Sequence, residues 1–211
     1  MARAYSTIAF TDRVRALQRQ HGSADAYARF LAPETPADDA LGAPEAEFIS
    51  ARDGFYQATI SETGWPYLQF RGGAPGFVHV VDEKTLAYAD FRGNRQYLSV
   101  GNLSGDDRIA LFFMDYPNQR RLKIFGHASV VDAEQNPEIV QSLHVPGYRA
   151  TPERAIIIKV AGFDWNCPQH IPKRLNASEL EIAIAPIRAR LAELETENAA
   201  LREKLSLNDA P

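Results

Sequence analysis

The residues best suited to chemistry lie in one run, Ala87 to Leu103, where an apolar segment ends in a basic loop. The loop contains Gly93, Asn94 and Arg95, and a short helix is expected directly after it. Backbone N–H groups at a helix start lack an intrahelical partner, so together with nearby cations and amides they bind anions. This spacing predicts a phosphate-binding loop.

Two further cations come from the segments on either side of this loop. Arg71 ends an alternating segment before it, and Arg121 begins one after it. A guanidinium fork suits phosphate, so cations that converge on an amide-rich loop would bind a phosphate carrying a ring system. Each residue alone has an ordinary explanation, as a surface arginine paired with Asp or Glu or as part of a common turn. The prediction therefore depends on their combination.

The elements that must position these residues are mostly short strands. Alternation bounded by turn residues predicts strands at 55–61, 67–71, 77–81, 85–89, 108–115, 121–131 and 155–163. Tight turns join most of them, whereas a parallel sheet needs a crossover helix at each step. The sequence therefore predicts a mainly β fold (β+α): a six-stranded antiparallel barrel with flanking helices. Side chains fill so small a barrel, so a ligand is expected on the outer wall or at a partner subunit.

The N-terminal region differs in pattern from the strands. Residues 12–31 predict one or two short amphipathic helices that break near His21 and Gly22. Residues 32–44 contain three prolines and are expected to form a linker or surface loop.

The composition argues against several classes of protein. The 211 residues carry a formal net charge of -4 and no dense Lys/Arg stretch, which disfavours binding to a nucleic-acid duplex. No apolar run is long enough for a membrane span, and the N-terminus lacks the layout of a secretion signal. The single cysteine, Cys167, excludes an intramolecular disulfide. A cytoplasmic protein is expected, and no hydrolase or nucleotide-hydrolase motif is present.

The C-terminal region carries a heptad pattern. Apolar or amide residues occupy a and d positions: Ile184, Leu191, Asn198 and Leu205 at a, and Ile187, Leu194 and Leu201 at d. An Asn at an a position favours a parallel two-stranded coiled coil, and the g-to-e pairs Arg190–Glu195 and Glu197–Arg202 would attract between parallel chains. The alternative is a single amphipathic helix packed on its own domain. Pro186 is expected to mark the start of the helix.

The strand order and the segments ADFRGNRQ, QRRLKIFGHA and FDWNCPQHIPKR resemble the FMN-binding split-barrel proteins related to pyridoxamine 5'-phosphate oxidase. The resemblance covers roughly residues 48 to 174. It implies a homodimer of split barrels that holds FMN non-covalently in grooves between the subunits. The expected organisation is N-terminal helices and linker at 1–47, an FMN-binding split barrel at 48–176 and a coiled-coil helix at 177–211.

The resemblance also implies roles for individual residues. Those expected to bind the FMN phosphate are Arg71, Gly93, Asn94, Arg95 and Gln96. The strand end beside the flavin, with largely backbone contacts, corresponds to Tyr88, Ala89 and Asp90. Arg121 resembles the residue near the polar pyrimidine edge of the flavin, and Lys123 shares its face at period two. Residues of the segment after the last strand that would line the pocket are Trp165, Gln169 and His170.

The expected function is that of an FMN-dependent oxidoreductase with an unassigned small-molecule substrate and NAD(P)H as a candidate donor. In pyridoxamine 5'-phosphate oxidases a Trp is followed closely by an Arg-Leu pair, whereas here a longer stretch separates Trp165 from Arg174 and Leu175, which argues against vitamin B6 phosphate as substrate. The alternatives are a flavin carrier or sensor without turnover, and an adaptor whose coil is the working part. No metal site is expected, because Cys167 and His170 are too few ligands.

Overall fold

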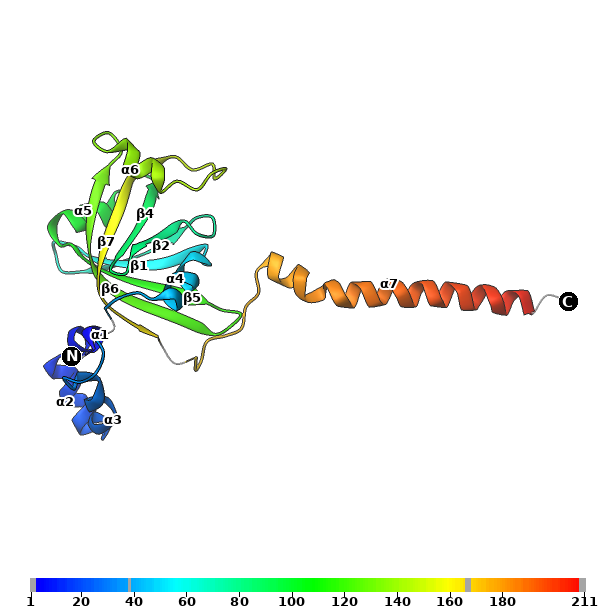
Figure 1. Ribbon diagram of the computed structural model, residues 1–211, viewed down its shortest axis with the longest axis horizontal. Helices are drawn as coiled ribbons and strands as arrows, with labels where there is room; N and C mark the ends of the chain where they lie inside the picture. The colour runs from blue at the N-terminus through cyan, green and yellow to red at the C-terminus, as the bar shows by residue number, and fades with distance from the viewer. Residues whose placement is uncertain (1–2, 38, 166–167, 209–211) are drawn as a thin grey trace. The chain divides into compact units, whose positions relative to one another are not determined.

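The computed structural model describes residues 3–37, 39–165 and 168–208 (Figure 1). Its helical elements are α1 (Ala4–Ala9), α2 (Asp12–Gln20), α3 (Ala24–Ala28), the 3-10 turn η1 (Arg29–Leu31), α4 (Ala43–Ser50), α5 (Leu98–Gly105), α6 (Pro137–Ser142) and α7 (Ala177–Asn208). Its strands are β1 (Gly54–Ile60), β2 (Pro66–Gly72), β3 (Val78–Asp82), β4 (Thr85–Phe91), β5 (Arg108–Asp115), β6 (Arg120–Asp132) and β7 (Pro152–Trp165).

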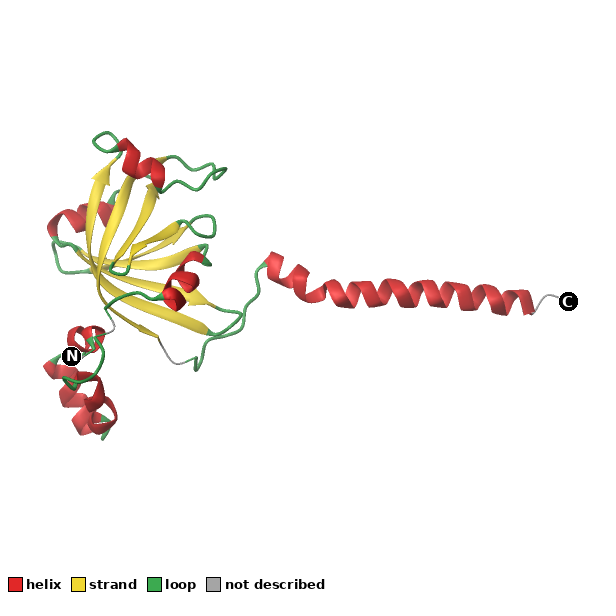
Figure 2. Ribbon diagram, in the orientation of Figure 1, coloured by secondary structure: helices red, strands yellow, loops and turns green. Residues whose placement is uncertain are grey.

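The strands form one antiparallel sheet in the order β2-β1-β5-β6-β7-β4-β3 (Figure 2). The predicted antiparallel fold with flanking helices is confirmed. All seven predicted strand segments pair in the sheet within the described ranges, so the expected barrel of six strands was one strand too small. The short β3 belongs to the sheet because it forms a tight hairpin with β4.

The two longest strands bend the sheet. β6 and β7 span 13 and 14 residues, and their pairing shifts at a bulge between Phe125 and Gly126. A Cβ on Gly126 would lie 2.6 Å from the backbone oxygen of Lys159, so this close approach of backbones requires glycine. The bulge lets one sheet curve around a core.

The core lies on the inner face of this curved sheet. Inner and outer residues alternate along β1 and β5, as the period of two predicts. The buried ring of Phe55 lies against the rings of Phe77, Tyr88 and Phe113, with centroid distances of 5.8, 5.4 and 4.9 Å. Aromatic packing of this kind fixes the ends of β1, β4 and β5 relative to one another.

The N-terminal helices pack against the outside of the sheet. The ring of Tyr5 in α1 stacks on Phe125 of β6 at 4.8 Å. A Cβ on Gly162 of β7 would lie 2.5 Å from the backbone nitrogen of Tyr5, so α1 rests directly on the strand backbone. The predicted break between two helices is confirmed at His21 and Gly22, where Gly22 has a φ of 71°.

The chain divides into two compact units, which within the described ranges comprise residues 1–115 with 119–170, and residues 116–118 with 171–211. The second unit contains α7. The expectation that Pro186 marks the start of this helix was wrong, because α7 begins at Ala177 and contains Pro186. Asn176 and Glu179 explain the early start: each side chain accepts a hydrogen bond of 2.8 Å from the other's backbone N–H, a capping box that begins the helix upstream of the proline.

Across the described residues, none of the helices combines the length and apolar character needed to cross a membrane.

Candidate functional site

The candidate site lies beside β2, the first edge strand of the sheet. Tyr67, Gln69 and Arg71 are half-buried along one side of this strand, whereas Leu68 and Phe70 alternate with them and are exposed on the other. The Tyr67 hydroxyl donates a 2.5 Å hydrogen bond to the side-chain oxygen of Gln69. The edge strand therefore presents a polar side to the site and an apolar side outward.

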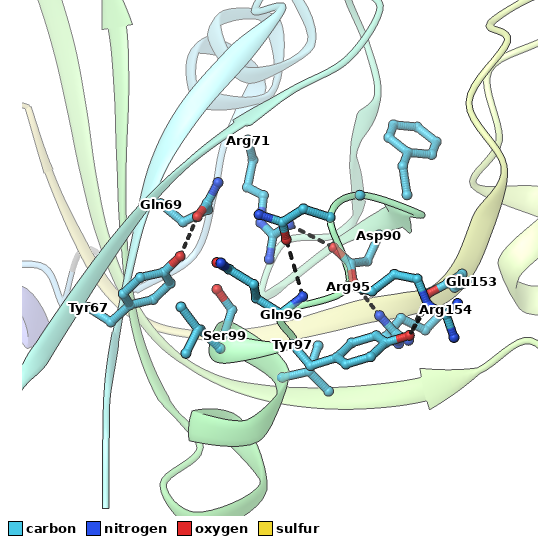
Figure 3. A pocket seen from close by; sticks show the side chains of 15 residues that line it. Tyr67, Gln69, Arg71, Asp90, Arg95, Gln96, Tyr97, Ser99, Glu153 and Arg154 are labelled. Carbon is cyan, nitrogen blue, oxygen red and sulfur yellow. Dashed lines mark hydrogen bonds and ion pairs between the residues drawn. The ribbon is translucent and has the colours of Figure 1, made fainter. Parts of the chain in front are cut away.

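The site itself is a pocket of about 240 Å³ between β2 and the loop that follows β4 (Figure 3). The residues predicted to bind the phosphate, Arg71, Gly93, Asn94, Arg95 and Gln96, all line it, and so does Asp90, which was predicted at the strand end beside the flavin. The first turn of α5 closes one side through Leu98, Ser99 and Val100. The structure thus brings strand, loop and helix start together as the sequence predicted.

The loop reaches the helix through strained backbone. Arg95 and Tyr97 have φ values of 62° and 55°, which non-glycine residues seldom adopt. The side chain of Asn94 accepts a 3.2 Å hydrogen bond from the Gln96 N–H, and Tyr97 precedes α5 without a side-chain cap. Loop residues held in this way orient Arg95 and the helix start toward one pocket.

Asp90 is the electrostatic centre of the pocket. It is 4% exposed and lies between two guanidinium groups: its Oδ1 is 2.9 Å from Arg71 Nη1, and its Oδ2 accepts a 2.9 Å hydrogen bond from Arg154 Nη1. The contact with Arg71 is an ion pair without hydrogen-bond geometry, and the buried Nε of Arg71 has no hydrogen-bond partner among the described residues. Arg71 therefore retains donor capacity in the pocket.

Arg154 is the main residue that the sequence analysis missed. It lies near the start of β7, opposite Asp90 of β4. Its guanidinium stacks over the Tyr97 ring at 5.2 Å and pairs with Glu153 at 3.0 Å. Burial lowers the pKa of Arg154, but the Asp90 carboxylate outweighs this and raises it overall. Its role could have been predicted only from the register of β4 against β7, and the alternation within each strand does not give that register. Other lining residues that the sequence analysis did not single out include Tyr67, Gln69, Ser99 and Glu153.

Tyr88 and Ala89 turn their side chains away from this pocket. The Tyr88 ring is buried in the main core and its hydroxyl donates to the side-chain oxygen of Gln57. Burial raises the pKa of Tyr88 above its usual value. Ala89 packs in a second core cluster with Val140 and Leu143.

A second pocket of about 180 Å³ adjoins the first. Both pockets share Arg71, Asp90 and Phe91, and the second is also lined by Tyr88, Ala89, Phe77 and Phe70. The strand end predicted to run beside a flavin therefore borders a cavity next to the cationic one.

Arg121 and Lys123 do not meet the pocket within one chain. The Arg121 guanidinium lies 6.0 Å from the centre of the Phe112 ring, and its buried Nε has no hydrogen-bond partner among the described residues. Lys123 pairs with Asp164 at 2.9 Å and lies over the Tyr5 ring. Burial lowers the pKa of Lys123, but its hydrogen bonds to Asp164 and Tyr5 raise it overall. Lys123 of β6 lies opposite Phe112 of β5. The same row of paired residues continues across the sheet to the exposed Phe70 of β2.

The segment after β7 is also placed away from the pocket. Trp165 Nε1 donates a 2.7 Å hydrogen bond to Glu45 of α4, and its ring lies edge-on to Phe48 at 4.7 Å. Gln169 and His170 are exposed, and His170 has a φ of 63°. Asn166 and Cys167 lie outside the described residues. No group of three or more His, Cys, Asp or Glu side chains able to hold a metal occurs in the part of the chain that the structure describes.

Comparison with known proteins gives a family. The family model described as pyridoxamine 5'-phosphate oxidase matches residues 44–161. No curated protein matches the sequence.

Several solved structures are similar. A putative pyridoxamine 5'-phosphate oxidase from Lactobacillus delbrueckii has 15% identity and a TM-score of 0.47, over 63% of this chain and 97% of that one. HupZ from Group A Streptococcus has 16% identity and a TM-score of 0.46, over 64% and 100%. An FMN-binding protein from Syntrophomonas wolfei has 10% identity and a TM-score of 0.44, over 58% and 86%.

Proposed function

Since the chain belongs to the pyridoxamine 5'-phosphate oxidase family, we propose that it is an FMN-dependent oxidoreductase whose pocket between β2 and α5 binds the FMN phosphate. The observation that carries this is the convergence of Arg71, Arg95 and the loop at Gly93 and Asn94 on one cavity. The substrate is unassigned.

The residues present fit a phosphate. Arg71 offers a buried Nε that lacks a hydrogen-bond partner among the described residues, and Arg95 comes from the facing loop. Two guanidinium groups and the amides of an uncapped helix start give a dianion several charge-assisted hydrogen bonds. Asp90 acts as a positioning residue, because its carboxylate holds the Arg71 side chain across the gap between β2 and β4.

Bound FMN would supply electron and hydride transfer, while the protein positions it and excludes water. The second pocket supports this assignment, because it continues from Arg71 and Asp90 along Tyr88 and Ala89. Phe77 and Phe91 also line this cavity. A second cavity that adjoins the cationic one leaves room for a molecule with a ring system at one end and a phosphate at the other.

A homodimer is part of the proposal. The outward side of β2 exposes Leu68 and Phe70, which are 64% and 55% exposed, and Trp65 just before the strand is 75% exposed. Large apolar side chains left exposed along one edge strand favour a protein interface. Arg121 and Lys123 lie apart from the pocket of their own chain, so a role near the flavin would require them to act at a site shared with a second copy.

The direct experiment uses the purified full chain. We expect a flavin absorption spectrum and release of intact FMN, identified by mass, on denaturation. Anaerobic NADH or NADPH should then bleach the bound flavin, and an oxidised acceptor should restore it. A colourless protein that takes up no added FMN would refute the flavin assignment, whereas bound FMN that neither nicotinamide reduces would favour a carrier or sensor.

A further inference from the structure

The strongest unexplained feature outside the pocket is the apolar seam of α7, defined here as the a and d positions Ile184, Ile187, Leu191, Leu194, Asn198, Leu201 and Leu205. The d-position side chains Ile187 and Leu194 are 68% and 44% exposed, and Leu191, Leu201 and Leu205 are exposed as well. The seam recurs every three and four residues along a continuous helix. Such a repeat is typical of a helix that pairs with another helix.

We propose that the seam of α7 binds the α7 helix of a second copy of this chain in a parallel, in-register coiled coil. This inference goes beyond the proposed function, because it concerns a self-association surface separate from the cofactor pocket. The argument for a second copy comes from the charges and the amide that accompany the seam.

The charges beside the seam are complementary in the parallel arrangement. Arg190 at g lies opposite Glu195 at e of the second copy, and Glu197 at g lies opposite Arg202 at e. Both pairs attract, and two-fold symmetry repeats each of them on the other side of the coil. Within one chain, Arg190 contacts Glu193 at 2.8 Å on the exposed surface, a pair of small energetic value that is easily exchanged.

Asn198 decides between parallel and antiparallel pairing. In a parallel, in-register coil, a positions face a positions, so the Asn198 amide hydrogen-bonds to its own counterpart. In an antiparallel coil, a positions face d positions, and Asn198 would oppose an aliphatic side chain with its amide unsatisfied. The parallel register therefore avoids this cost.

The first experiment traps the geometry with a disulfide in the full chain. Leu205→Cys on a Cys167→Ser background places the two cysteines opposite each other only when the helices are parallel and in register. We expect most of the protein to form a covalent dimer in a mildly oxidising buffer. Absence of this dimer, with the thiol still reactive toward a small alkylating reagent, would overturn the proposal.

Two pairs of variants show whether the seam itself holds the copies together. In the same cysteine background, Leu194→Glu with Leu201→Glu should abolish crosslinking, because it places four carboxylates in the seam of the dimer. The matched control, Ala192→Glu with Ala199→Glu, adds the same charge at outward b positions and should crosslink normally. Equal crosslinking in the two would mean that the barrels alone bring the helices together, and would refute the proposal.

A charge exchange tests the orientation independently. Arg190→Glu creates repulsion with Glu195 of the second copy and should lower the fraction of covalent dimer at equilibrium in a thiol-disulfide buffer. Adding Glu195→Arg should restore it, because attraction returns between these two positions in the parallel coil. A double variant that crosslinks no better than Arg190→Glu alone would contradict the parallel register, since positions 190 and 195 would then not face each other across the seam.

Discussion

At the scale of single residues, Asp90 organises the candidate site. One buried carboxylate fixes two guanidinium groups from different strands, Arg71 from β2 and Arg154 from β7. A phosphate entering the pocket would find both cations already oriented, so less side-chain entropy would be lost on binding. The same arrangement makes Asp90 a structural residue, because it connects the edge strand β2 to β4.

We expect Asp90→Asn to lower the free energy of unfolding by about 3 kcal/mol, because two partly buried guanidinium groups lose their charged partner. Asp106→Asn is the matched control, since Asp106 pairs with the exposed Arg108 and its loss should lower stability much less. Urea unfolding of the three proteins measures the difference. Equal destabilisation by the two substitutions would contradict a special role for Asp90.

Tyr88 gives a pH-dependent prediction. Burial, and to a smaller extent the charge of Asp90, raises the pKa of Tyr88 in the folded protein, although Arg71 opposes this. Because the pKa is raised in the folded protein, the contribution of protonated Tyr88 to the free energy of unfolding is complete below its unfolded-state pKa of about 10. This contribution is lost as the pH rises above that value, by about 1.4 kcal/mol for each pH unit. Tyr88→Phe should therefore show a shallower decline of unfolding free energy in alkali than the wild type. Identical slopes would rule this out.

At the scale of elements, the sequence predicted features that depend on local patterns better than features that depend on strand pairing. Alternation placed the strands, and the break at Gly22 placed the N-terminal helices, because both depend on residues close in sequence. The start of α7 was mispredicted because Pro186 was weighed without the capping box at Asn176 and Glu179. Arg154 was missed because its partner Asp90 lies 64 residues away, and register between distant strands is set by packing.

The contact of α1 with β7 can be tested at one glycine. Gly162→Ala places a Cβ 2.5 Å from the backbone nitrogen of Tyr5, so α1 must move away. We expect a loss of about 1 to 3 kcal/mol in stability and faster hydrogen exchange of the α1 amides. Gly105→Ala is the control, because its Cβ would meet open space. Unchanged exchange in α1 would show that the helix does not depend on this contact.

At the scale of the whole molecule, the sequence predicted the cationic loop and the arginine that faces it. It did not predict where the other candidate site residues lie relative to the pocket. Arg71 and Arg95 meet in one pocket because β2 and the loop after β4 adjoin. Arg121 and Lys123 lie elsewhere, because the elements that a strand residue meets depend on the strand order and curvature of the whole sheet. Trp165, which was expected to line the pocket, instead packs against α4 through a contact between residues 120 positions apart in the sequence.

The proposed barrel interface predicts a specific loss of association. In a chain whose α7 seam carries Leu194→Glu and Leu201→Glu, the barrels alone should maintain a dimer. Adding Leu68→Glu should then produce monomers, because a charge would enter the apolar side of β2. Val81→Glu is the control, as Val81 is similarly exposed at 60% but lies on β3. Light scattering across a dilution series measures both, and a dimer that persists in the Leu68 variant would exclude this face.

The most direct test of the central claim compares the affinities of the apoprotein for FMN and for riboflavin, which lacks the phosphate. Wild-type protein should prefer FMN. Arg71→Ala and Arg95→Ala should each weaken FMN binding by roughly 1.5 to 3 kcal/mol, or about 10- to 150-fold, and leave riboflavin binding nearly unchanged. Arg92→Ala should have little effect, because Arg92 is exposed and pairs with Glu153 at 3.5 Å. Equal affinity for the two flavins in the wild type, or an FMN preference that survives both pocket substitutions, would contradict the account.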